Sequence, residues 1–175
     1  MSTTDVQADL LAALIASTAT FQSVTNTASM AAAKVRIAIG EATDDGHEDS
    51  DGQTPLDLPR AVVTRASERT SVVGTATYAG SGELLVLFEF RAPGSKVTQN
   101  EQEAWFTAAT SDIVREAFTL SVSRASPTGY STSHLQIRSS DLSDVSYLRP
   151  GLDQQPDENE TRPRLRWQRE WRVEY

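Results

Sequence analysis

The sequence predicts an α+β domain in which a mostly antiparallel sheet carries two amphipathic helices on one face. Three observations favour this fold. The last eleven residues alternate between apolar and polar side chains, two segments repeat apolar residues with a helical period, and a glycine-bearing stretch separates two alternating arms. At 175 residues, the chain is long enough to bury its own core, so we expect a single domain over residues 1–175.

The first helix is predicted to begin near Asp5 and to end near Ala19. Thr3 or Thr4 can cap it, and Asp5 suits the positive end of the helix dipole. The apolar stripe follows the 3.6-residue period and comprises Val6, Leu10, Leu11, Leu14 and Ile15. A short helical turn is expected over 28–33.

A short strand is predicted over 35–39, and a long acidic loop over 40–58 follows this first strand. The loop has no hydrophobic pattern and no Lys or Arg. Its acidic residues are Glu41, Asp44, Asp45, Glu48, Asp49, Asp51 and Asp57. A long unpatterned loop in a compact domain is usually functional or disordered.

A strand over 60–65 and then a hairpin are predicted in the centre of the chain. The arms of the hairpin are 72–78 and 84–90, since apolar or small residues alternate in each. The turn is assigned to Ala79–Gly82, whose glycines can adopt the positive φ of tight turns.

A second amphipathic helix is predicted from a cap at Thr98 or Asn100 to about Leu120. Its apolar stripe comprises Trp105, Phe106, Ala109, Ile113, Val114, Ala117 and Phe118. One or two short strands are expected around Leu135 and Ile137, and around Val145 and Tyr147. Residues 149–163 are rich in proline and polar groups and are expected to form an extended connection.

The terminal strand, over 164–175, carries two of the three tryptophans. Trp167 and Trp171 share one face of the alternation, and most of the neighbouring arginines fall on the other. Only Arg169 interrupts the apolar face. A half-buried strand that closes the core, or docks on a neighbouring subunit, is therefore favoured over an aromatic platform for nucleic acid.

Composition excludes several functional classes. The chain has no cysteine, so it has no disulfide, no thiolate nucleophile and no cysteine-ligated metal. A net charge of −8 makes it a poor candidate for gripping DNA or anionic lipid. No apolar run approaches the ~20 residues that span a bilayer, so we expect no membrane association.

The charges are segregated along the chain, which suggests an interface between copies. Complementary patches can pair within a subunit or between subunits. The candidate interface residues are Asp44, Asp45, Asp49 and Asp51 in the acidic loop and Arg164, Arg166, Arg169 and Arg172 in the terminal strand.

No residue pattern indicates catalysis, a cofactor or a metal. His47 and His134 have no partner histidine at ligand spacing, and a solvated histidine is favoured for each. An EF-hand register starting at His47 puts Leu58 where a bidentate Glu is required, so a solvated acidic loop is favoured over calcium. We therefore expect no enzyme activity.

The chain resembles the tail terminator, or tail-completion, proteins of long-tailed bacteriophages. The resemblance spans most of the chain as a pattern rather than as a diagnostic motif. It rests on the leucine-rich helix Leu10–Ile15, Val35–Glu41 with its acidic loop, Pro59–Val63 leading to the hairpin and its following helix, and the strand with Trp167 and Trp171.

The resemblance implies a structural virion protein without a cofactor. Such proteins form a ring, commonly a hexamer, that caps the tail tube, ends its polymerisation and joins it to the head connector. The implied partners are further copies of the chain, the tail tube protein and a head-completion or stopper protein. DNA would pass through the lumen without specific binding. The implied location is the virion, at the tail or head–tail junction, and the host cytoplasm during assembly.

Three alternatives stay open at this point, of which the last is a monomeric regulatory module in a host cytoplasm. The first is a neck, stopper or minor tail protein, which the sequence does not distinguish from a terminator. The second is a small α+β enzyme or ligand-binding domain that uses a pocket between sheet and helices, and it predicts convergent polar groups in an apolar cleft.

Overall fold

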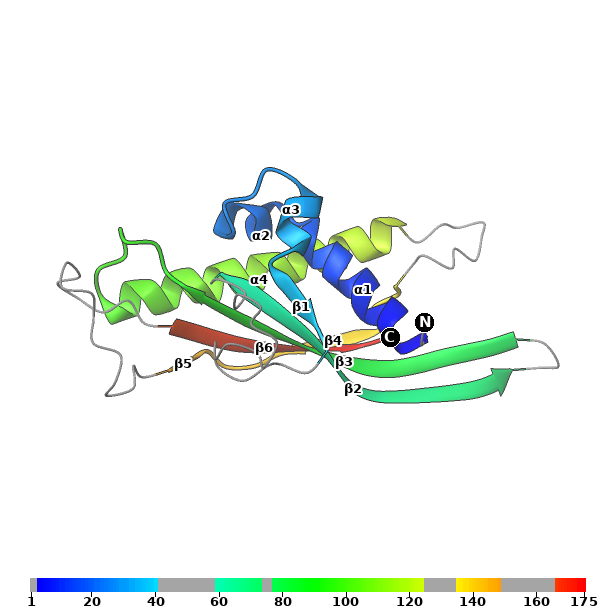
Figure 1. Ribbon diagram of the computed structural model, residues 1–175. Coiled ribbons are helices and arrows are strands. Elements are labelled where there is room, and N and C mark those ends of the chain that lie inside the picture. The colour runs from blue at the N-terminus through cyan, green and yellow to red at the C-terminus, as the bar shows by residue number, and fades with distance from the viewer. Residues whose placement is uncertain (1–2, 41–58, 74–76, 125–134, 149–165) are drawn as a thin grey trace, which may run out of the picture.

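The computed structural model contains a mostly antiparallel sheet with helices (Figure 1). It describes residues 3–40, 59–73, 77–124, 135–148 and 166–175. The helices are α1 (Thr3–Ala16), α2 (Ala19–Val24), α3 (Met30–Lys34) and α4 (Gln99–Arg124). The strands are β1 (Ile37–Ile39), β2 (Arg60–Val73), β3 (Thr77–Arg91), β4 (Ser139–Leu142), β5 (Ser146–Leu148) and β6 (Arg166–Glu174).

The strand order β1-β2-β3-β6-β4 places the two longest strands and the C-terminal strand in the middle of the sheet, and β5 also pairs with β6. Every pairing between the described strands is antiparallel except that of β1 with β2. The predicted α+β class with a mostly antiparallel sheet is confirmed.

The core lies between the sheet and the helices. In Figure 1, α1 and α4 lie on the same side of the sheet. The alternation of β3 and β6 directs one set of side chains to that side. The fully buried members of that set include Val86, Phe88, Phe90, Trp167 and Trp171, which pack with Leu11, Ile15, Phe106 and Ile113 of the helices. The apolar face predicted for the terminal strand is thus the floor of the core.

Three helices begin at hydroxyl caps. The Thr18 hydroxyl accepts a hydrogen bond from the Phe21 amide at 3.3 Å, and Ser29 caps α3 in the same way. The prediction that the first helix continues to about Ala19 is wrong, because α1 ends at Ala16 and a separate helix, α2, begins at Ala19. The cap of α4 is Thr98, one of the two predicted residues.

The predicted hairpin turn at Ala79–Gly82 is wrong. These residues lie inside β3, and the chain reverses between Val73 and Thr77, which are paired. Gly82 has a different reason to lack a side chain. An added Cβ would lie 2.5 Å from the Tyr175 hydroxyl oxygen and 2.6 Å from the Ser67 carbonyl oxygen.

The strand predicted around Leu135 and Ile137 begins later, at Ser139, although both apolar side chains are buried. The acidic loop over 40–58, beyond Gly40 itself, and the connection over 149–163 lie outside the described residues, as do His47 and His134. No helix in the described ranges is long and apolar enough to cross a membrane.

Candidate functional site

The distal part of the β2–β3 hairpin, which we call the distal ribbon, consists of Arg69–Val73 paired with Thr77–Ser81. The pairing of β3 with β6 reaches only Glu83, and backbone hydrogen bonds between Gly82 and Tyr175 extend it by one residue. Among the described strands, none pairs with the distal ribbon from outside. Figure 1 shows it extending past the rest of the sheet.

The distal ribbon has an unusual composition for a pair of strands with no further strand beside it among the described residues. The sequence from Thr70 to Gly82 contains no Asp, Glu, Lys or Arg and no proline, and it includes Val72, Val73 and Tyr78. Natural proteins usually protect free strand edges with charges or prolines. An isolated two-stranded hairpin is also marginally stable in water. The distal ribbon is therefore a candidate binding surface.

A buried ionic cluster lies on the face of the sheet opposite the main core. Glu89 is 1% exposed near the C-terminal end of β3, between Phe88 and Phe90. Its carboxylate accepts hydrogen bonds from Arg60 Nε at 3.0 Å and pairs with Arg60 Nη2 at 2.9 Å. Arg166 pairs with the other carboxylate oxygen. Nothing in the local sequence pattern separates this Glu from a surface residue of the same strand.

Arg172 occupies the same face as Arg166 and is half exposed. Its Nε lies 2.8 Å from Glu83 Oε1, and its Nη2 lies 3.9 Å from Glu170 Oε1. Exposed pairs of this kind contribute at most ~1 kcal/mol each. They orient the side chain more than they stabilise the fold.

Arg169 lies on the helix side of the sheet, where the sequence places it. Its guanidinium donates to the Ser143 carbonyl at 2.7 Å, to the Ser111 hydroxyl at 3.0 Å and to the Thr110 hydroxyl at 3.1 Å. Partial burial lowers the pKa of Arg169, and the charge of Asp144 opposes that shift. The side chain therefore ties β6 to α4 and to the segment after β4.

Only three of the predicted interface residues lie among the residues that the structure describes. Arg166, Arg169 and Arg172 all have partners in their own chain. The structure brings them to one strand but to two faces of it. The remaining candidates, Asp44, Asp45, Asp49, Asp51 and Arg164, lie outside the described residues. Pairing between the acidic loop and these arginines stays a prediction.

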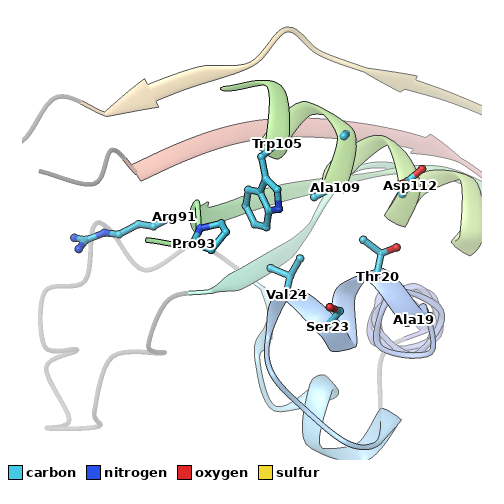
Figure 2. Close-up of a pocket in the computed structure, with 10 residues that line it drawn as sticks. Ala19, Thr20, Ser23, Val24, Arg91, Pro93, Trp105, Ala109 and Asp112 are labelled. Atoms are coloured by element: carbon cyan, nitrogen blue, oxygen red, sulfur yellow. The ribbon is translucent and has the colours of Figure 1, made fainter. Parts of the chain in front are cut away.

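A cleft of about 700 Å³ opens between α2 and α4 (Figure 2). The residues that line this α2–α4 cleft are Ala19, Thr20, Ser23, Val24, Arg91, Pro93, Trp105, Ala108, Ala109 and Asp112. Trp105 forms the largest apolar wall and meets Phe90 edge-on, with ring centroids 6.0 Å apart. Its indole lies between α4 and α2, above Val24 in Figure 2.

Two polar residues that line the α2–α4 cleft, Thr20 and Asp112, have partners within the chain. Thr20 donates its hydroxyl hydrogen to Glu116 Oε1 at 2.5 Å, and its amide donates to Oε2 at 3.1 Å. Asp112 pairs with Arg115 at 2.8 Å. The remaining walls are mostly small and apolar, so the cleft suits uncharged side chains.

Sequence reasoning missed this cleft because its residues come from three separate elements. Its one local signal is Trp105, which the helical period assigned to the apolar stripe of α4. In the described part of the chain, no group of three His, Asp or Glu side chains could hold a metal ion.

The chain matches no protein-family model and no curated protein at a significant level.

Proposed function

We propose that this protein is a structural subunit of a bacteriophage tail, which forms a ring that caps the tail tube, ends its polymerisation and joins it to the head connector. The proposal rests on the resemblance to tail terminator proteins and on one structural observation. The distal ribbon, which carries no charged residue from Thr70 onward, projects from the sheet without a third strand among the described residues. A surface of this kind needs a partner, and in a ring each copy supplies one.

The net charge of −8 supports the same proposal. A ring on a tail must let DNA slide through its lumen, and acidic side chains facing the lumen repel phosphate. Asp44, Asp45, Asp49 and Asp51 are the candidates for that lining or for contacts between subunits. Their combined reversal to Lys is expected to impair assembly or DNA passage, and unchanged virion yield and infectivity would contradict this role.

A neck or stopper protein would use similar surfaces but a different partner. A terminator binds the end of the tail tube, whereas a stopper binds the head connector. Pull-down of the purified chain with each partner separates the two positions. Retention by tube protein alone favours the terminator, and retention by the connector alone favours the stopper.

The self-assembly step is tested by light scattering over a concentration series, with negative-stain images of the same samples. We expect rings, or a mass that rises towards six chains. Val73→Lys, in the distal ribbon, is expected to reduce this assembly, and Val122→Lys, at a site on α4 that is 60% exposed, serves as the matched control. The mass of a single chain at every concentration would contradict self-assembly.

A further inference from the structure

We infer that the α2–α4 cleft of one copy is the receptor for the distal ribbon of the next copy. This inference rests on the proposed function and names the contact that would build the ring. Its two components are Arg69–Val73 with Thr77–Ser81 on one copy and the Trp105 wall with α2 on the other.

The ribbon and the cleft lie at opposite ends of the same strand. β3 begins in the distal ribbon at Thr77 and ends at Arg91, which lines the cleft together with Pro93. Fourteen residue steps at ~3.3 Å separate the two ends by roughly 45 Å. Figure 1 shows the same arrangement, with the ribbon at the right and the start of α4 at the left.

Two different patches at opposite ends of a subunit produce a head-to-tail contact. Such a heterologous contact closes into a ring when the rotation between copies is right, whereas a patch that pairs with itself gives a dimer. The positions of ribbon and cleft therefore match the assembly that the proposed function requires.

The chemistry of the two surfaces is also complementary. The distal ribbon from Thr70 onward brings no charge into the cleft, so its burial leaves no unpaired ion. The carboxylates of Asp112 and Glu116 already have partners, so neither calls for a cationic ligand. Arg91 is exposed at the rim and points away from the cleft in Figure 2.

Trp105 has the properties of an interface anchor. It is only half-buried, unlike Trp167 and Trp171, which are at most 1% exposed. Tryptophans that are half-covered in a free subunit and lie in a pocket are typical hot spots of protein interfaces. The indole N–H makes no hydrogen bond within the described residues, and a free ribbon edge offers backbone carbonyl groups as acceptors.

The absence of cysteine allows a direct test by cross-linking. Chains carrying Ser23→Cys, in the cleft, are mixed with chains carrying Thr77→Cys, in the ribbon, and treated with a short bismaleimide. We expect a covalent dimer in this mixture. A matched mixture in which Ala31→Cys, an exposed site on α3 outside the cleft, replaces Ser23→Cys is expected to give none.

A second experiment fills the cleft with a larger side chain and measures self-association. Ala108→Trp is expected to weaken self-association by about tenfold or more, since it occupies the place of the ribbon next to Trp105. Ala31→Trp, the control, is expected to leave the association unchanged. Both variants are first compared with the parent protein by circular dichroism, so that a loss of association is read only in folded protein.

The outcomes separate this inference from the proposed function. Oligomers that form without the Ser23–Thr77 cross-link, and that tolerate Ala108→Trp, overturn the cleft as receptor and leave the ring intact. A chain that stays monomeric at every concentration overturns both. Cross-linking between Thr77→Cys and Ala31→Cys chains, equal to that with Ser23→Cys, would also overturn the assignment.

Discussion

The two halves of the β2–β3 hairpin belong to the same strands but differ in what surrounds them. The proximal half contributes Ala61, Val63, Val86 and Phe88 to the core, all fully buried. The distal half has no described third strand beside it, and no charged residue from Thr70 onward. Regular pairing continues through both halves, so backbone hydrogen bonding alone does not determine which part is packed.

Two local features mark the boundary between the halves. The register of β2 shifts between Arg65 and Ser67, and the Tyr175 ring covers Gly82 on the neighbouring strand. A bulge increases local twist and can redirect a strand. The proximal half is therefore stabilised by contacts within its own chain, and these two features mark where that packing ends.

The largest expected effect is on the core side of this comparison. Trp171 is fully buried and stacks on Phe88, with ring centroids 6.3 Å apart. Trp171→Ala is expected to lower the free energy of unfolding by about 4 kcal/mol, measured by urea denaturation. Phe118→Ala, at a site that is 43% exposed, is the control and is expected to cost about 0.5 kcal/mol or less.

A substitution in the distal ribbon is expected to affect self-association rather than the unfolding free energy of the single chain. Val73→Ala should change self-association while leaving the unfolding free energy of the single chain within about 0.5 kcal/mol. If Val73→Ala destabilised the chain as much as Trp171→Ala, the two halves would form one packed unit, and the comparison would be wrong.

The next largest effect concerns Glu89. Glu89→Leu leaves Arg60 and Arg166, with side chains 8% and 18% exposed, without the carboxylate that holds them. A loss of about 3 kcal/mol is expected, because breaking a buried ion pair leaves an uncompensated charge. Adding Arg60→Met to Glu89→Leu should recover part of this loss. A double variant no more stable than Glu89→Leu would show that packing, rather than charge, is the function of Glu89.

The terminal strand and the hairpin differ in how far they could be predicted. The alternation of Trp167, Trp171 and Val173 correctly predicted the buried face of β6, because one face of that strand contacts the core. The turn was misplaced because Gly80 and Gly82 resemble turn residues, although both lie inside β3. The lack of a side chain at Gly82 is explained instead by the close approach of Tyr175, which lies 93 residues away in the sequence.

The candidate site was less predictable than the fold. The α2–α4 cleft combines α2, the end of β3 and α4, and no local pattern marks such a combination. Glu89 stands between Phe88 and Phe90 in the sequence, and its two arginines, Arg60 and Arg166, come from other strands. Arg169 was recognised as an exception on the apolar face, but its partners on α4 depend on the tertiary structure.

A smaller effect is expected at the boundary itself. Gly82→Ala would place a Cβ against the Ser67 backbone and the Tyr175 side chain, so we expect a loss of about 2 kcal/mol in unfolding free energy. Gly94→Ala is the matched control, because an added Cβ there meets nothing within 4 Å. Equal effects at the two glycines would mean that the Tyr175 contact does not define the boundary.

A loss of stability smaller than that at Gly82 is expected at the cap of α4, the helix that carries Trp105. The Glu101 amide donates to the Thr98 hydroxyl at 3.2 Å, and Glu101 Oε2 accepts from the Thr98 amide at 2.9 Å and from the Val97 amide at 3.1 Å. These hydrogen bonds, first of all the one from the Thr98 backbone, lower the pKa of Glu101. Thr98→Ala is expected to cost about 1 kcal/mol.

The pH dependence of this cap follows from the sign of the pKa shift. A carboxyl with a lowered pKa in the folded state contributes stability above its unfolded pKa and loses it as the pH falls through the folded pKa. In an NMR titration, we therefore expect the Thr98 and Val97 amide signals to move together with the Glu101 carboxyl, at a pH below the ordinary Glu value. A Glu101 that titrates at or above that value would mean that the cap is open in solution.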